Sequence, residues 1–164
     1  HRFGTVSERS RETVEQLAEA CRDAGCRPVF VRGNHDTALD AVRGDVRDAY
    51  VAGEDPRIVV CHGHEEPSVD ADAYVIGHDH PAIEIEGQRR PCFLHVPAAY
   101  RDADLLVVPA FSRLAAGVTI NDARAGDLLS PLLDDLDDVR PVVYDEEREE
   151  ALTFPPLGSF RRLL

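Results

Sequence analysis

The chain has 164 residues, of which 43% are hydrophobic, so it is long and apolar enough to form a single domain over residues 1–164. It contains no run of 18 apolar residues, which excludes a transmembrane helix, and no signal peptide is visible, so we expect a cytoplasmic protein without a membrane partner. The formal net charge is −13 and all 18 basic residues are arginine, a composition typical of halophilic proteins, so the acidity by itself does not exclude an anionic substrate.

The first predicted element is a helix over residues 7–23. Ser7 or Ser10 would cap its start, and Gly25 would follow its end. Its apolar residues recur at helical spacing, at Val14, Leu17, Ala18 and Cys21.

Short apolar runs predict the strands that follow. Residues 28–32, 57–61 and 73–76 each indicate a strand, and each run ends at a turn that carries Asn or His. The rest of the chain is β-rich, with strands predicted at 83–86, 90–96, 104–109, 141–144 and 151–154. The acidic run 134–138 is predicted to be a solvated loop. The cysteines form no C-x-x-C motif, so we expect reduced, buried thiols at Cys21, Cys26, Cys61 and Cys92.

Five of the seven histidines fall in three short blocks, at residues 33–36, 62–64 and 77–80. Each block follows a predicted strand, and residues at strand ends meet at one edge of a sheet in α/β proteins. Imidazole nitrogens together with an Asn carbonyl oxygen suit Mn, Fe, Zn or Ni better than Ca. The blocks therefore predict a metal site, whose candidate ligands are Asn34, His62, His78 and His80.

The order of these blocks, G-N-H-D, then H-G-H, then G-H-x-H, resembles the calcineurin-like metallophosphoesterases and is most similar to their compact, archaeal-type members. The resemblance implies an α/β fold in which a β-sandwich is flanked by helices, here lacking its first strands. It also implies an enzyme that hydrolyses phosphate mono- or diesters. Two divalent ions would activate the attacking water, Mn in the first place, with Fe, Zn or Ni as alternatives.

The resemblance also implies roles for individual residues. One metal ion would be held by Asn34, His62 and His78. His80 would be a ligand of the other ion. His35 would contact the phosphate and stabilise or protonate the leaving oxygen, and Asp36 would orient His35 through a carboxylate–imidazole hydrogen bond.

Other polar residues carry weaker predictions. His64 either lines the site or faces solvent, and both alternatives stay open. His95 is predicted to be a surface or hydrogen-bonded strand histidine. Contact with substrate phosphate is considered for Tyr100, Arg101 and Arg113, although the default position for an arginine in this chain is the surface.

Two upstream blocks of the family pattern, D-x-H and G-D-x-x-H/D, do not occur in the chain. We therefore expect an N-terminal truncation, with His1 as the last residue of the second block and the remaining ligands before it. The fragment would then hold at most one ion, weakly. One alternative is a non-catalytic metal-binding or interaction fragment. Another is a nuclease of the DNA-repair type, with nucleic acid in place of a general phosphate ester as the partner. The oligomeric state is left open.

Overall fold

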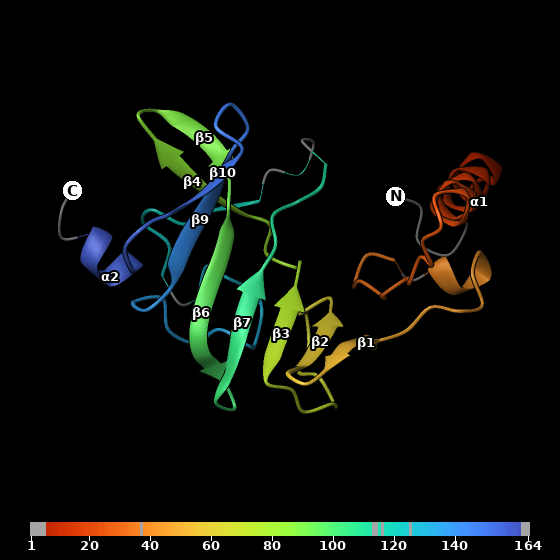
Figure 1. Cartoon of the computed structure of the whole chain (residues 1–164), viewed down its shortest axis with the longest axis horizontal. Helices are drawn as coiled ribbons and strands as arrows, with labels where there is room; N and C mark the ends of the chain where they lie inside the picture. The colour runs from red at the N-terminus through yellow and green to blue at the C-terminus, as the bar shows by residue number, and fades with distance from the viewer. Residues whose placement is uncertain (1–5, 37, 113–114, 116, 125, 162–164) are drawn as a thin grey trace.

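The computed structural model describes residues 6–36, 38–112, 115, 117–124 and 126–161, so the predictions for His1 and Arg113 lie outside the described residues. The chain has a mixed α/β fold with few helices, built on a large mixed sheet (Figure 1). The seven strands of this sheet run in the order β1 (Ala49–Glu54), β2 (Arg57–Cys61), β3 (Ala73–Ile76), β7 (Ala103–Val107), β6 (Phe93–Tyr100), β9 (Arg140–Asp145) and β10 (Glu150–Thr153).

A second sheet of three strands completes the core. Its strands run in the order β5 (Gln88–Pro91), β4 (Pro81–Ile85) and β8 (Val118–Thr119). Ile83 of β4 is fully buried in one cluster with Leu94 and Leu105 of the large sheet. The segment between β8 and β9 adds further buried side chains to this cluster, at Ile120, Leu132, Leu133, Leu136 and Val139. Removal of this apolar surface from water is the main force that holds the two sheets together.

Strands β2, β3 and β7 are parallel neighbours in the large sheet. Val59 pairs with Tyr74, and Tyr74 pairs with Leu105. The carboxyl ends of parallel neighbours lie at the same edge of a sheet. The segments that follow these three strands, 62–64, 77–80 and 108–112, therefore meet at one edge. The predicted bounds of the strands at 57–61 and 73–76 are confirmed.

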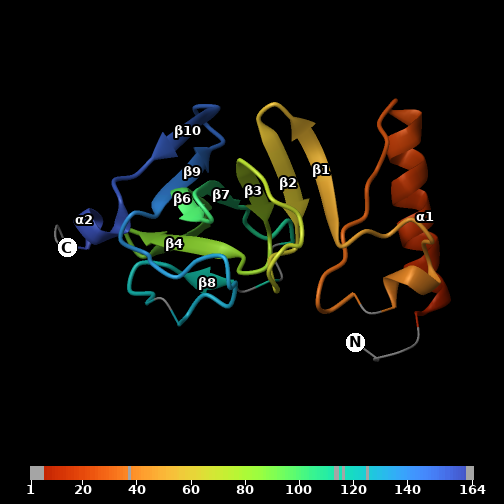
Figure 2. The same ribbon diagram turned by 90° about the horizontal axis from the view of Figure 1, so that it is seen from below.

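The α-helices lie at opposite ends of the large sheet and do not cover its faces (Figures 1 and 2). Helix α1 (Glu8–Asp23) stands beyond β1 and is followed by a 3₁₀ turn, η1 (Leu39–Ala41), whereas α2 (Leu157–Phe160) lies near β9. None of the helices in the described ranges has the length and apolar character needed to cross a bilayer. The β-rich part of the expected fold is thus present, but the helices flank it only at its ends.

Helix α1 forms at the predicted place but does not bury its predicted face. The Ser7 hydroxyl caps it by accepting a hydrogen bond from the Ser10 amide at 3.1 Å. Of the apolar stripe, Ala18 is buried, whereas Leu17 is 57% exposed. The reason is the position of the helix, because it stands beyond the edge strand and has no sheet face against which to pack.

The strand predicted over residues 28–32 does not form. Only Val31 pairs, in an isolated parallel bridge with Arg47. The Arg47 amide donates to the Phe30 carbonyl at 2.9 Å, and the Arg32 amide donates to the Arg47 carbonyl at 2.8 Å. A strand requires successive pairs of this kind to satisfy its backbone groups, and the partner segment bends at the next residue.

All four cysteines are free, but they are not all buried. Cys61 and Cys92 lie in the core, and burial raises the pKa of their thiols to about 11 and about 12. Cys26 is exposed because it follows α1, which lies off the core. A thiol with a raised pKa is not a thiolate near neutral pH, so Cys61 is not a nucleophile in spite of its position beside His62.

Candidate metal centre

Three side chains from separate loops converge at the carboxyl edge of the parallel strands. Asn34 comes from the turn after Val31, His62 follows β2, and His78 follows β3. The Nε2 atom of His62 lies 3.0 Å from Asn34 Oδ1 and 3.1 Å from His78 Nδ1. The fold therefore brings together the three residues that were predicted to share one metal ion.

The separations between these donor atoms suit a shared ion. Two ligands that each lie about 2.1 Å from a metal, at an angle of roughly 90–110°, are about 3.0–3.4 Å apart. Asn34 Oδ1 carries no hydrogen and His62 Nε2 carries at most one, so only one of the two contacts can be a linear hydrogen bond. A divalent cation would use the lone pairs of all three atoms.

The donor set is poor in negative charge. Within the described part of the chain, no three side chains of His, Cys, Asp or Glu are placed so that they could hold a metal ion. The cluster reaches three donors only because the amide oxygen of Asn34 contributes. Neutral ligands of this kind suit a borderline metal ion, and they hold it less tightly than a set that includes carboxylates.

The surroundings keep the two imidazoles neutral. Burial, together with the neighbouring imidazoles of His78 and His64, lowers the pKa of His62 to about 4. Burial also lowers the pKa of His78, although the charge of Asp79 raises it. Only a neutral imidazole has the lone pair that a metal ligand needs. Both rings are thus prepared to bind a cation at neutral pH.

The lowered pKa of His62 predicts a pH dependence of stability. In the unfolded chain His62 takes up a proton near pH 6.5, whereas in the folded protein it does so only near pH 4. The unfolded state therefore binds more protons between these values, and the free energy of unfolding is expected to fall as the pH is lowered from 6.5 to 4. Urea unfolding in the presence of a chelator measures this slope. It should be smaller in His62→Gln and unchanged in His95→Gln, and equal slopes in all three proteins would contradict the prediction.

Gly33 allows the first loop to approach His62. A Cβ atom at Gly33 would lie 2.7 Å from Asp36 Oδ2 and 3.3 Å from His62 Cε1, so a side chain there would require the carboxylate of Asp36 and the ring of His62 to shift. The charge of Asp36 raises the pKa of His62, and that of His35 lowers the pKa of His78, so both residues lie near the cluster. The predicted hydrogen bond between His35 and Asp36 is not among the contacts of the described residues, and their roles stay predictions.

His64 lies against the other histidines. Its ring centroid is 5.2 Å from that of His62 and 6.1 Å from that of His78. Its Nε2 atom is 3.9 Å from the carboxylate of Glu65, whereas its buried Nδ1 atom has no hydrogen-bond partner within the described residues. His62 and His64 also line a pocket of about 300 Å³. Of the two alternatives for His64, this position favours a lining residue.

Side chains tie the loop that follows His64 to the turn between β6 and β7. The Tyr100 hydroxyl donates a hydrogen bond to Glu66 at 2.8 Å, and Arg101 donates to Glu66 at 3.3 Å and to Asp70 at 3.2 Å. Tyr100 and Arg101, which were considered as phosphate contacts, thus hold the carboxylates of this loop. Their positions give them a structural role in placing the loop.

The loop before β4 carries His80 and the buried Asp79. His80 has a φ of 49°, a left-handed conformation that is uncommon for a residue with a side chain, and it lowers the pKa of both His62 and His78. Asp79 is only 4% exposed, and its Oδ1 accepts a hydrogen bond from the Leu129 amide at 2.6 Å. Its Oδ2 has no partner in the described ranges. The sequence reasoning missed Asp79, whose only signal was its place between two candidate ligands.

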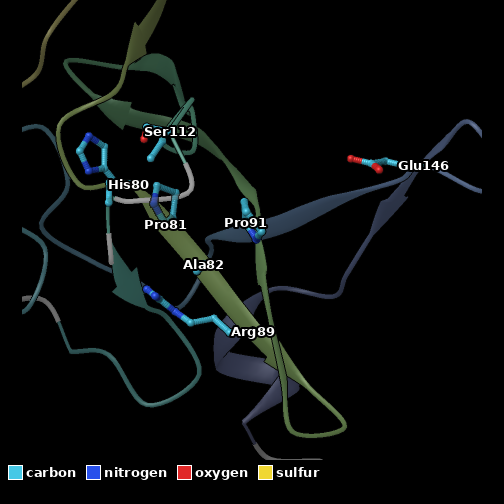
Figure 3. Close-up of a pocket in the computed structure, with 9 residues that line it drawn as sticks. His80, Pro81, Ala82, Arg89, Pro91, Ser112 and Glu146 are labelled. Atoms are coloured by element: carbon cyan, nitrogen blue, oxygen red, sulfur yellow. The ribbon is translucent and has the colours of Figure 1, made fainter.

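A pocket of about 460 Å³ opens beside His80 (Figure 3). Pro81 of β4 and Pro91 of β5 form part of its wall, and Ser112 comes from the segment that follows β7. In Figure 3, Glu146 lies at the far end of this pocket from His80. The pocket therefore adjoins His80, whereas Asn34, His62 and His78 are not among the described residues that line it.

Comparison with known proteins gives one informative likeness. No protein-family model and no curated protein matches the chain. Among solved structures, the fold is similar to that of the Pseudomonas putida nuclease MPE, with a TM-score of 0.54 and 22% sequence identity. The likeness covers 94% of this chain but only 66% of the nuclease chain. At this identity the likeness shows a shared fold alone.

Proposed function

We propose that the protein is a metal-dependent phosphoesterase of the calcineurin-like type. The observation that carries the proposal is the convergence of Asn34 Oδ1, His62 Nε2 and His78 Nδ1 at the carboxyl edge of parallel strands. The fold likeness to a nuclease supports a phosphoester as the substrate. The neutral imidazoles support a cation as the cofactor.

Each residue of the cluster has a distinct proposed task. The first divalent ion, with Mn²⁺ as the preferred candidate, would be held by Asn34, His62 and His78. When bound, such an ion supplies the Lewis acidity that activates water and offsets charge on the phosphate oxygens. His35 would donate a proton to the leaving oxygen, and Asp36 would orient the imidazole of His35.

His80 is the proposed ligand of a second ion. Among the described residues, no set of His, Cys, Asp or Glu side chains completes a site around His80. The proposal for this second ion therefore rests on the motif G-H-x-H and on the nearness of His80 to His62 and His78. Tight binding of the second ion would need ligands beyond those that the described residues bring together.

Nucleic acid is the second candidate for the substrate. The similar fold of the Pseudomonas putida nuclease favours it over a small phosphomonoester. The net charge of −13 argues against a large basic surface for nucleic acid, but it does not determine the potential at a single cleft.

The proposal is tested by turnover with and without metal. The intact protein is stripped with a chelator, supplied with Mn²⁺, and assayed on 4-nitrophenyl phosphate, bis(4-nitrophenyl) phosphate and a single-stranded oligonucleotide. We expect Mn²⁺-dependent hydrolysis. On the oligonucleotide, whose leaving alkoxide needs a proton, His35→Ala should lower kcat by about 10²–10⁴-fold, as loss of a general acid does, without a change in Mn²⁺ affinity. The loss should be much smaller on the two nitrophenyl esters, because nitrophenolate leaves without a proton.

His95→Ala serves as the matched control, because His95 lies on β6, away from the cluster, and its Nε2 is 3.7 Å from the Asp104 carboxylate. This variant should retain wild-type turnover. Absence of hydrolysis on every ester, or full activity in His35→Ala, would refute the proposal. Metal binding without any hydrolysis would support the alternative of a non-catalytic metal-binding fragment.

A further inference from the structure

Phe111 is the most exposed large apolar side chain in the described part of the chain. Its relative exposure is 107%, against 70% for Leu129 and 57% for Leu17. A single exposed apolar residue is ordinary in itself. The position of Phe111 indicates a function, because both of its chain neighbours, Ala110 and Ser112, line the pocket beside His80.

The topology places this segment at the candidate metal centre. Strand β7 is parallel to β3, and the segment after β7 runs past the segment that carries His78. The Val108 amide donates a hydrogen bond to the Ile76 carbonyl at 2.7 Å, and a Cβ atom on Gly77 would lie 3.3 Å from Val108 Cγ2. Phe111 therefore follows a backbone that is fixed against the base of the His78 loop.

The pocket combines small apolar walls with one guanidinium group, that of Arg89, and with the imidazole of His80 and the carboxylate of Glu146 at its opposite ends. Pro81, Ala82 and Pro91 form the wall, and Arg89 reaches across it toward β8 (Figure 3). Arg89 donates hydrogen bonds to Thr119 Oγ1 at 3.1 Å and to the Gly117 carbonyl at 2.9 Å, which fix its orientation. None of the ion pairs within the described residues includes Arg89, so its charge is not neutralised by a carboxylate there.

We propose that Phe111 and this pocket form a subsite for an unpaired nucleotide, with the base stacked on Phe111 and a backbone phosphate near Arg89. The substrate class would then be single-stranded nucleic acid, an inference that rests on the proposed phosphoesterase function. An exposed aromatic ring can stack on any base, and a guanidinium group suits a phosphate. A phosphomonoester without a base would leave Phe111 unused.

The subsite is tested by binding, with a chelator present so that no hydrolysis occurs. The probes are a fluorescein-labelled thymidine hexamer and an abasic hexamer with the same phosphates, followed by fluorescence anisotropy. We expect the thymidine hexamer to bind more tightly. Stacking of one base on an aromatic residue contributes about 1–3 kcal/mol, so Phe111→Ala should reduce the preference by roughly 5- to 150-fold. Phe111→Tyr should restore it.

Leu17→Ala is the matched control, because it removes an exposed apolar side chain on α1, away from the pocket. It should leave both affinities unchanged. Arg89→Gln should weaken both hexamers alike, since they share the phosphates. Equal binding of the two hexamers by the wild type, or an unchanged preference in Phe111→Ala, would overturn the subsite.

Hydrolysis of the same hexamers with Mn²⁺ separates this inference from the proposed function. A base preference in binding without any hydrolysis would mean that the phosphoesterase proposal fails while the base subsite stands. Hydrolysis of both hexamers at equal rates, unaffected by Phe111→Ala, would mean that the subsite fails while the phosphoesterase proposal stands.

Discussion

Replacement of His62 by alanine is expected to cause the largest loss of metal affinity of any single substitution in the chain. His62 Nε2 is the central donor, since it contacts both Asn34 Oδ1 and His78 Nδ1. Its removal leaves two donors that no longer share a neighbour. Loss of a residue that merely supports a ligand lowers metal affinity by about 10–100-fold, so loss of this ligand should exceed that range. Mn²⁺ titration by calorimetry measures the effect.

The same titration on His95→Ala shows whether the loss is specific to the cluster. His95 is half-exposed on β6 and its Nε2 atom lies 3.7 Å from the Asp104 carboxylate, so its removal should leave Mn²⁺ affinity unchanged. Thermal unfolding in a chelator checks that both variants fold. Equal Mn²⁺ affinities in His62→Ala and His95→Ala would contradict the assigned ligand set.

Replacement of Gly117 by alanine is expected to destabilise the protein and to displace His80. Gly117 has a φ of +61°, and a Cβ atom there would lie 1.9 Å from the carbonyl oxygen of His80. That oxygen also accepts a hydrogen bond from the Val118 amide at 3.2 Å, so the strain falls on the pairing of β4 with β8. A left-handed alanine costs about 1–2 kcal/mol, and overpacking adds about 1–3 kcal/mol.

Gly87→Ala carries only the first of these two costs, so its comparison with Gly117→Ala isolates the second. Gly87 has a φ of +74°, but a Cβ atom there would meet nothing within 4 Å. Both variants place an alanine in a left-handed conformation, and only in Gly117→Ala does the new Cβ atom clash with the His80 carbonyl oxygen. Urea unfolding should therefore show a larger loss of stability in Gly117→Ala, and the Mn²⁺-dependent rate should fall in that variant alone. Identical stability and rate in the two variants would contradict the prediction.

The strands predicted most accurately are those in which the apolar sequence pattern matches burial inside the sheet. The run 73–76 is apolar throughout and the run 57–61 is apolar after Arg57, because both lie inside the large sheet, and their bounds are confirmed. Strand β1 was missed because Ala49–Glu54 lies at the sheet edge, contains Gly53 and pairs through an irregularity in register. Strand β8 was missed because it has two residues. The false strand at 28–32 shows that an apolar run forms a strand only where a neighbour continues the ladder.

The meeting of His62 and His78 at one edge could be predicted because both follow neighbouring parallel strands. The place of Asn34 was predicted from the family pattern, since the strand expected before it does not form. The sequence could not show which further residues face that edge. Asp79 was hidden by its histidine neighbours, and Phe111 follows a strand that ends in ordinary apolar residues. Only the folded structure shows that the carboxylate of Asp79 is buried and that the ring of Phe111 is exposed.

The position of α1 beyond the edge strand has a consequence for the metal centre. The segment that contains α1 stands beyond the end of the sheet (Figure 2). Asn34, which follows this helix in the chain, places its Oδ1 atom 3.0 Å from His62 Nε2. An ion shared by Asn34, His62 and His78 would cross-link the segment that carries Asn34 to the loops that follow β2 and β3. Thermodynamic linkage makes the effect reciprocal. Packing of this segment against the sheet would raise the affinity for the ion, and bound ion would stabilise the packed position of the segment by the same free energy.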